Sequence, residues 1–364
     1  MCIRDRGISK GDTVSIIAAN TPEIFEAHYS IPMIGAVINT INTRLDAETI
    51  AYILDHSDAK LLITDTQFSP TMKKALSLYG KNIPIIDIHD DQALFKEGEG
   101  ERIGKWTYED FLLTGDDNFE WSLPDDEWQA ISLSYTSGTT GKPKGVVYHH
   151  RGSYLMSTGS VTAWNMPNKL TFLYTVPMFH CNGWGYPWTA ALIHAKVVCC
   201  RYIIAKDIYN LIDQHKVTHF GGAPIVLSLI ANADEKDKKV INHKVFVLTA
   251  GAPPTSAILE KMDNLGFEVM HVYGLTETYG HILQCAWNEE WNELPKTEKA
   301  DINSRQGVRY PNTEEVIVAD PESHKRVPMD GKTMGEILIR GCLLYTSDAA
   351  DEGLGVDLGG RRII

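Results

Sequence analysis

The sequence predicts an α/β protein in which mainly parallel β-sheets are covered by helices. Short runs rich in Ile, Val and Leu alternate with segments of helical periodicity, which is the pattern of repeated β-α units. These strand-like runs are apolar on both faces, as in a sheet that is buried on both sides. Several of them end in glycine and polar residues, where sheets of this class bind ligands.

The first third of the chain repeats this alternation. A strand is expected at residues 13–17, and the Asn20-Thr21-Pro22-Glu23 string is a helix start whose helix is expected to continue to about Val37. The elements that follow are a helix at 46–56, a strand at 60–64, a helix at 70–78 and a strand at 83–86. Residues 90–128 are acidic and show no clear period, so they are predicted to form a long surface excursion.

The remaining elements keep the same order until residue 287. They are a strand at 131–135, a helix at 149–164, a strand at 170–176, a strand end at 219–224, a strand at 245–249, a helix at 255–265 and a strand at 268–272. Acidic, tryptophan-containing loops are expected after residue 287, followed by an antiparallel pair of strands at 315–318 and 335–340.

Composition excludes several classes of protein. The chain has 364 residues and 43% apolar content, enough for one large or two medium domains. Its net charge of -13 argues against nucleic acid or an anionic membrane as the main partner. No apolar run approaches the ~20 residues of a membrane span, and there is no signal-like N-terminus, so a cytoplasmic protein is expected. The six cysteines show neither metal-ligand spacing nor a disulfide framework.

Residues 135–145 read Tyr-Thr-Ser-Gly-Thr-Thr-Gly-Lys-Pro-Lys-Gly and predict a phosphate-binding loop. Glycines let backbone N–H groups approach an anion, hydroxyls donate to phosphoryl oxygens and lysines supply positive charge. The alternative interpretation is an ordinary polar turn between two strands. The string does not fit the Gly-x-x-x-x-Gly-Lys-Ser/Thr spacing, so a different nucleotide-using family is indicated.

Three further strings follow strand-like runs and are candidates for a pocket. Residues 177–184 read Pro-Met-Phe-His-Cys-Asn-Gly-Trp, residues 251–254 read Gly-Ala-Pro-Pro, and residues 273–278 read Tyr-Gly-Leu-Thr-Glu-Thr. His180 has an alternative as a hydrogen-bonded structural histidine, and the Thr276-Glu277 pair as a helix cap.

The phosphate-loop string, Gly-Ala-Pro-Pro and Tyr-Gly-Leu-Thr-Glu-Thr, in this order and spacing, resemble the acyl-adenylate-forming enzymes. Residues 177–184 and 306–311 most resemble AMP-forming acyl-CoA synthetases for short- and medium-chain acids, of the 3-methylmercaptopropionyl-CoA ligase type. The resemblance covers residues 7–341. It implies the large N-terminal domain of that fold, with two β/α subdomains and a small distorted β-barrel.

The resemblance also implies the reaction and its co-substrates. A carboxylate attacks the α-phosphorus of ATP to give an acyl-adenylate and pyrophosphate, and the thiol of coenzyme A then displaces AMP. Mg²⁺ would neutralise the phosphates, with Glu277 as its protein ligand and Thr276 as donor to the α-phosphate. The β- and γ-phosphates would be held by Thr136, Ser137, Gly138, Thr139, Thr140, Gly141 and Lys144, with Lys142 nearby.

The remaining implied roles concern adenine and the acid. Gly251, Ala252 and Pro253 would form one wall against adenine, and Tyr273, followed by Gly274, would stack on the other face. The acid would be met by His180 and Trp184, with Gly221, Gly222 and Tyr279 as further wall positions. Peptide-synthetase domains carry an aspartate near this position, so His180 and Cys181 disfavour an amino-acid substrate. Trp184 and Trp188 either shorten the pocket or belong to the core.

The two ends depart from the family pattern. Residues 1–6 and 342–364 match nothing in the family and are predicted to be non-native, and the C-terminal lid domain with its catalytic lysine is expected to be absent. Little or no ligase activity is therefore expected of this chain. The alternatives are a non-catalytic ATP- or AMP-binding module and an acyl-adenylating enzyme that serves a carrier protein. A homodimer is also among the expected partners.

Overall fold

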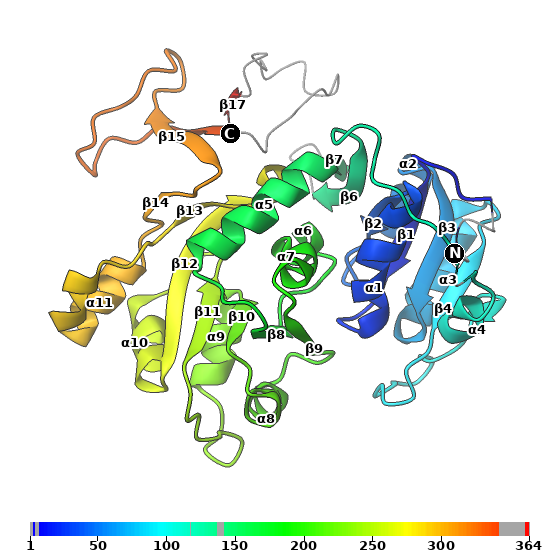
Figure 1. Cartoon of the computed structure of the whole chain (residues 1–364), viewed down its shortest axis with the longest axis horizontal. Coiled ribbons are helices and arrows are strands. Elements are labelled where there is room, and N and C mark those ends of the chain that lie inside the picture. The colour runs from blue at the N-terminus through cyan, green and yellow to red at the C-terminus, as the bar shows by residue number, and fades with distance from the viewer. Residues whose placement is uncertain (1–2, 4–6, 117, 137–141, 342–360, 364) are drawn as a thin grey trace. The chain divides into compact units, whose positions relative to one another are not determined.

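The computed structural model describes residues 3, 7–116, 118–136, 142–341 and 361–363, and its helices and mainly parallel sheets confirm the predicted α/β class (Figure 1). The chain divides into two compact units. Unit 1 comprises Met1–Arg151, Leu173–Ala191 and Val197–Ile203, and unit 2 comprises Gly152–Phe172, Leu192–Lys196 and Ile204–Ile364.

Unit 1 contains a seven-stranded sheet of order β5-β4-β3-β1-β2-β6-β7. Its strands are parallel except β7, which runs antiparallel to β6 at the edge. The elements are β1 (Thr13–Ile17), α1 (Pro22–Ser30), η2 (Pro32–Ile34), β2 (Val37–Thr40), α2 (Ala47–His56), β3 (Ala59–Asp65), η3 (Thr66–Phe68), α3 (Ser69–Tyr79), β4 (Ile85–Ile88), β5 (Trp106–Thr107), α4 (Tyr108–Leu112), β6 (Ala130–Thr136), β7 (Lys144–His149), α6 (Cys181–Trp184) and α7 (Tyr186–Leu192).

One prediction in this unit is wrong, and another, the surface excursion at 90–128, holds but lacked two short elements. The helix expected to reach Val37 ends at Ser30, and residues 37–40 form the central strand β2 instead. Two residues prevent the helix from continuing: Pro32 lacks a backbone N–H to donate, and Gly35 has a φ of +77°. The excursion at 90–128 contains β5 and α4, with the Phe111 side chain buried, and these elements are too short to give a readable period.

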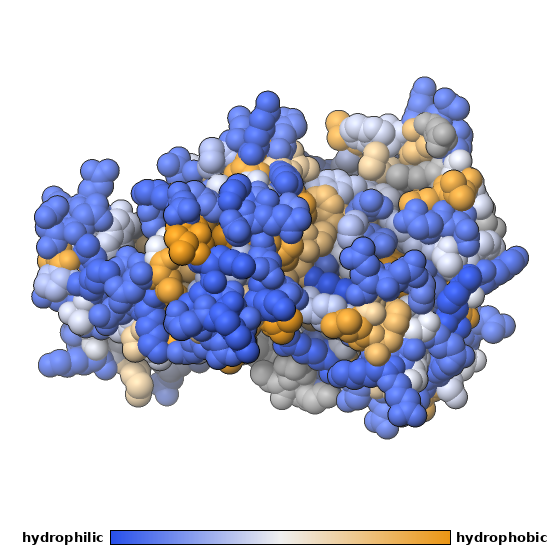
Figure 2. Space-filling view, turned by 90° about the horizontal axis from the view of Figure 1, so that it is seen from below, coloured by the Kyte–Doolittle hydropathy of each residue, from blue (hydrophilic) through white to orange (hydrophobic). Residues whose placement is uncertain are grey.

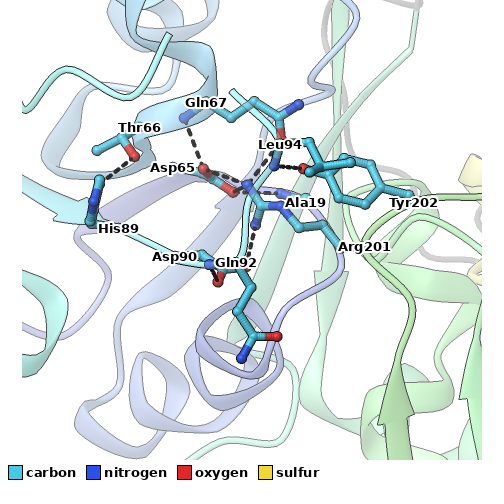
Figure 3. Close-up of polar contacts among 10 residues, drawn as sticks. All are labelled: Ala19, Asp65, Thr66, Gln67, His89, Asp90, Gln92, Leu94, Arg201 and Tyr202. Carbon is cyan, nitrogen blue, oxygen red and sulfur yellow. Dashed lines mark hydrogen bonds and ion pairs between the residues drawn. The ribbon is translucent and has the colours of Figure 1, made fainter. Parts of the chain in front are cut away.

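An ion pair fills the topological switch point of this sheet, the gap between β1 and β3 where the strand order reverses. Figure 3 shows Arg201 between Asp65, which ends β3, and Asp90. The Arg201 Nη2 lies 2.9 Å from Asp65 Oδ2 and donates to Gln67 Oε1 at 2.9 Å. The Asp65 side chain is fully buried and that of Arg201 is 10% exposed. The usual ligand crevice of such a sheet is therefore occupied by the protein's own charges.

Removing one charge of this pair is expected to destabilise unit 1. Asp65→Asn or Arg201→Met should each lower the free energy of unfolding by about 3 kcal/mol, because the remaining buried charge loses its nearest partner, although Arg201 keeps Asp90 at 3.4 Å in the first variant. The double variant should lose clearly less than the sum. Urea unfolding measures all three, with Glu268→Gln in the exposed Lys244 pair as a control that costs less than ~1 kcal/mol. Strict additivity would contradict the pairing.

Unit 2 is built mainly around a second seven-stranded sheet of order β14-β13-β12-β11-β10-β8-β9, in which β10, β11 and β12 are parallel. The elements after β7 and outside α6 and α7 are α5 (His150–Ala163), β8 (Thr171–Tyr174), β9 (Lys196–Cys199), α8 (Ala205–His215), β10 (His219–Gly222), α9 (Pro224–Ala231), β11 (Val245–Thr249), α10 (Ser256–Asn264), β12 (Phe267–Leu275), η4 (Thr276–Thr278), β13 (Gly280–Gln284), η5 (Glu289–Glu293), α11 (Lys296–Asn303), β14 (Val308–Arg309), β15 (Thr313–Ala319), β16 (Glu336–Gly341) and β17 (Arg361–Ile363).

The last strands correct the expectation of a barrel. The pairing of β15 with β16 confirms the predicted antiparallel pair, and β17 adds a third strand. In the part of the chain that is described, this sheet is open, because β15 and β17 are its two edges and a barrel requires its edge strands to pair. The region after residue 287, expected as loops, also contains η5 and α11.

The surface agrees with the acidic composition. The face in Figure 2 is mostly hydrophilic and carries its hydrophobic side chains in small, separate groups. Among the residues that are described, no helix has the length and apolarity needed to cross a membrane.

Buried histidines make the stability sensitive to acid. Burial lowers the pKa of His219 on β10 to about 4, and its ring packs between Trp164 and Phe246. The unfolded state takes up a proton near pH 6.5 and the folded state near pH 4, so this contribution to stability is complete above pH 6.5 and is lost as the pH falls toward 4. His219→Phe should flatten the fall in unfolding free energy between pH 6.5 and 4.5, measured by urea unfolding. An unchanged slope would contradict this.

Candidate active site

The flanks of the phosphate-loop string form a β-hairpin in unit 1. Strands β6 and β7 pair Tyr135 with Gly145 and Thr136 with Lys144. The hairpin therefore brings Thr136 and Lys144, both predicted phosphate ligands, opposite each other at its end. The other predicted ligands in the string, Ser137, Gly138, Thr139, Thr140 and Gly141, lie outside the described residues.

Helix α2 braces both arms of this hairpin. The His56 Nδ1 and the Tyr135 hydroxyl share a hydrogen bond of 2.8 Å, and the His56 ring stacks on Tyr52 at 5.3 Å. The Lys142 Nζ lies 5.7 Å from the centre of the Tyr52 ring, within cation–π range. Burial, and then Tyr52, raise the pKa of the Tyr135 phenol, which therefore keeps its proton for the hydrogen bond. Asp46 caps α2 by accepting from the Thr49 N–H at 2.8 Å.

The predicted acid-pocket residues of unit 1 lie on the short turn after β8. His180 is exposed, so its ring is accessible to a ligand. Its Nε2 lies 3.9 Å from Cys181 Sγ. Neighbouring protein atoms partly desolvate the ring although the residue is exposed, and this desolvation, and then the charge of Arg44, lower the pKa of His180, so the ring is neutral at pH 7. Trp184 is only 6% exposed. Trp188 donates its Nε1–H to the His28 carbonyl at 3.1 Å, a contact within the protein core.

The predicted adenine and phosphate residues of unit 2 meet at one edge of its sheet. Parallel pairing sets Gly222, Thr249 and His271 in register across β10, β11 and β12. The last residues of these strands and the residues that follow them are therefore brought toward the same edge. These are the predicted wall positions Gly221 and Gly222, the predicted adenine wall Gly251, Ala252 and Pro253, and the predicted nucleotide residues Tyr273, Gly274, Thr276 and Glu277.

Two glycines at this edge are required by the backbone. Gly251 has a φ of +88°, a conformation that side-chain-bearing residues rarely adopt. At Gly274 an added Cβ would lie 1.7 Å from the Gly280 carbonyl oxygen, because β12 and β13 approach each other closely there. Tyr279 ends the turn with a φ of +62°, and its side chain is buried.

Thr278 holds the turn that presents Thr276 and Glu277. The single proton of its buried hydroxyl is shared between the Leu275 and Gly280 carbonyls, at 3.0 and 2.8 Å from Oγ1, and Oγ1 accepts from the Leu275 N–H at 2.9 Å. Thr278 therefore supplies a capping contact to this turn. Glu277 is half-buried, and burial, followed by the Glu277 charge, raises the pKa of Tyr273.

Sequence reasoning missed two residues that position these groups, Thr278 and His56, and it gave Asn182 only as a candidate for the pocket, not as a residue that holds the turn. Thr278 stands inside a string that was singled out, but no role followed from its type. His56 is separated from Tyr135 by 79 residues, so only the tertiary structure joins them. Asn182 is fully buried beside His180, although asparagine after a strand usually indicates an exposed turn.

The α2 brace is expected to support phosphate binding. His56→Phe and Tyr135→Phe each remove the 2.8 Å hydrogen bond, and each should weaken ATP binding about 3- to 10-fold while costing about 1 kcal/mol of stability. Isothermal titration with ATP and Mg²⁺ measures the affinity, and the exposed Tyr154→Phe serves as control. If the three variants and the parent chain bound ATP with equal affinity, the contacts of α2 with the hairpin would have no role in phosphate binding.

Comparison with known proteins gives the same assignment as the motifs. The family described as AMP-binding enzyme matches residues 1–346. The acetate/butyrate–CoA ligase AAE7 of Arabidopsis thaliana, named as peroxisomal, is 45% identical over 348 residues, which cover 93% of this chain and 61% of that ligase. The 2-methylpropanoate–CoA ligase CCL4 of Humulus lupulus is 42% identical over 342 residues, covering 93% of this chain and 61% of that ligase.

Solved structures share the fold at low identity. The o-succinylbenzoate coenzyme A synthetase of Bacillus subtilis, solved in complex with ATP and magnesium ion, has a TM-score of 0.76 and 20% identity and covers 100% of this chain and 68% of that one. The N-terminal domain of FACL13 from Mycobacterium tuberculosis has a TM-score of 0.76 and 20% identity, covering 100% and 84%. This chain spans 61% of the length of the two curated ligases. The protein belongs to the AMP-binding enzyme family, the acyl-adenylate-forming enzymes that its three motifs resemble.

Proposed function

We propose that this chain is the part of an AMP-forming acyl-CoA ligase that binds ATP and a short-chain carboxylic acid and forms the acyl-adenylate. The observation that carries the proposal is the common carboxyl-terminal edge of the parallel strands β10, β11 and β12. Gly251 follows β11, Tyr273 lies near the end of β12, and the Thr276-Glu277 turn follows β12. A neutral histidine and a phosphate-loop hairpin complete the chemical requirements in unit 1. The names of the two related ligases, both for short acids, support the substrate class.

Each residue has a role that follows from charge control. An attacking carboxylate is repelled by the phosphates, so the site has to neutralise them before reaction. Lys144 and Thr136 would hold the β- and γ-phosphates, and Thr276 would donate to the α-phosphate. A neutral His180 can donate one hydrogen bond to the acid without protonating it, which keeps the carboxylate nucleophilic. The acyl-adenylate would then meet the thiol of coenzyme A, which displaces AMP.

The donor set fits a magnesium ion held largely by the nucleotide. Among the described residues no group of three or more His, Cys, Asp or Glu side chains converges on one point. Glu277 would therefore be the protein ligand, with phosphate oxygens and water as the others, which is how Mg²⁺ is usually bound at nucleotides. Bound there, the ion would neutralise phosphate charge.

Ligand binding to the chain as it stands tests the proposal without requiring turnover. A butyryl-AMP analogue with a non-hydrolysable sulfamoyl link should bind about 100-fold more tightly than AMP, because it resembles the reaction intermediate. Lys144→Ala should weaken ATP binding about 10-fold and leave the analogue unaffected, because the analogue has no β- or γ-phosphate. Glu277→Gln should reduce the dependence of ATP affinity on Mg²⁺, because the ion loses its protein ligand and keeps its phosphate ligands. Isothermal titration measures all three.

Matched variants control for changes of charge alone. Lys60→Ala removes an exposed lysine of β3, and Glu268→Gln removes an exposed glutamate from the same strand, β12, that leads to Glu277. Neither should change any affinity by more than about twofold. Equal affinity of the parent chain for AMP and the analogue would instead support a non-catalytic nucleotide-binding module. Coenzyme A and a carrier-protein thiol are distinguished by supplying each to the whole protein.

The compartment belongs to the same proposal. Cys181, Cys199, Cys200 and Cys285 are free thiols, which suits a reducing compartment such as the cytoplasm. The Arabidopsis relative is named as peroxisomal, so a fluorescent fusion of the whole protein, imaged with a peroxisome marker, decides between the two.

A further inference from the structure

The turn that carries His180 and Trp184 has a rare backbone conformation. Five successive residues have positive φ: Cys181 at +46°, Asn182 at +44°, Gly183 at +56°, Trp184 at +60° and Gly185 at +76°. A left-handed conformation costs roughly 1–2 kcal/mol for each residue that bears a side chain. Gly183 adopts it freely, and an added Cβ there would lie 3.2 Å from the Tyr174 ring. Such a turn persists only where the surrounding structure holds it in place, and strain of this kind concentrates at functional sites.

A buried network around the Asn182 amide holds the turn. The Ser132 and Ser134 hydroxyls of β6 both donate to Asn182 Oδ1, at 2.5 and 3.1 Å. The Asn182 Nδ2 lies 3.2 Å from His28 Nε2. Both serines and His28 are almost completely buried, and Asn182 has no exposed surface. The amide therefore joins three elements that are distant in sequence.

The proton positions in this network are determined by its geometry. The His28 Nδ1 lies 2.7 Å from the Ile24 carbonyl oxygen, which can only accept, so Nδ1 carries the proton. Nε2 is then the acceptor for the Asn182 amide N–H. Burial lowers the pKa of His28 to about 4, so the ring stays neutral at pH 7. Every polar group that meets Asn182 is satisfied, and asparagine is the side chain that both donates and accepts here.

The chain before the turn is held just as firmly. The buried Asn20 side chain donates to the Tyr174 and Val176 carbonyls at 3.0 and 2.9 Å and accepts from the Met178 N–H at 2.8 Å. Thr40 donates to the Phe179 carbonyl at 3.0 Å. His180 and Cys181 are the two residues between this fixed segment and Asn182, so the backbone of His180 is held on both sides.

We infer that Asn182 is a positioning residue for the carboxylic acid, which fixes His180 and Trp184 against strand β6, the strand that leads into the phosphate loop. This inference rests on the proposed function. Ser134 and Ser132, which bind Asn182, lie on β6 two and four residues before Thr136. Strand β6 therefore holds the turn at residues 180–184 through its serines and also carries the first predicted phosphate ligand. A shift of the turn would displace the acid from the phosphate it has to attack, and small displacements of this kind reduce reactivity strongly.

Asn182→Gly tests the inference, because glycine keeps the left-handed backbone and removes the hydrogen bonds. It should weaken binding of the butyryl-AMP analogue about 10- to 100-fold and change AMP binding less than about twofold, since AMP lacks the acyl group that this turn meets. Ser132→Ala/Ser134→Ala removes the same bonds while Asn182 stays, and it should give the same selective loss. Thermal unfolding of each variant shows that it is folded.

Asn39→Ala is the matched control. Asn39 is as buried as Asn182, accepts from the Ser15 hydroxyl at 2.9 Å and donates to the Leu133 carbonyl at 2.9 Å, but has no bond to the turn. It should lose a similar amount of stability and keep the ratio of analogue to AMP affinity. An unchanged ratio in both Asn182→Gly and the double serine variant overturns the inference. A parent chain without preference for the analogue over AMP overturns the proposed function itself, so the two failures are distinguishable.

Discussion

Parallel pairing of β10, β11 and β12 is the constraint on which the nucleotide part of the candidate site depends. Strands that run in the same direction end at the same edge, so three strings of the sequence that are tens of residues apart reach one place. The close approach of β12 to β13 then requires Gly274, and Thr278 ties the following turn to both strands.

In unit 1 the predicted phosphate ligands lie on a hairpin and the predicted acid-binding residues lie on a strained turn, not at the ends of parallel strands. Its switch point is filled by the buried pair of Arg201 and Asp65, so the ligand position common to such sheets is closed. Charge at the candidate site comes from the hairpin of β6 and β7, which α2 braces through His56. The turn at residues 180–184, which is predicted to meet the carboxylic acid, is held by hydrogen bonds between neutral groups. These bonds do not compete with the charges of the substrates.

Sequence patterns predicted the elements with a clear period and failed at short ones. Helix α2 was expected because its apolar residues, among them Ile50 and Leu54, repeat at helical spacing after the capping Asp46. Strand β2 was missed because it has only four residues and follows a helix start whose periodicity continues across Pro32. The open sheet of β15, β16 and β17 depends on pairing between distant segments, which no local pattern reports.

The sequence by itself determined the α/β class, the family and the identity of the chemical groups, because glycines, hydroxyls, lysines and an acid at fixed spacing specify what a loop can bind. The tertiary structure alone decided which residues hold those groups in place. Asn182 is 50 residues from Ser132 and 154 from His28, and His56 is 79 from Tyr135. Such partners are joined only when the chain folds, because burial makes an unsatisfied polar group costly and so selects the contacts that satisfy it.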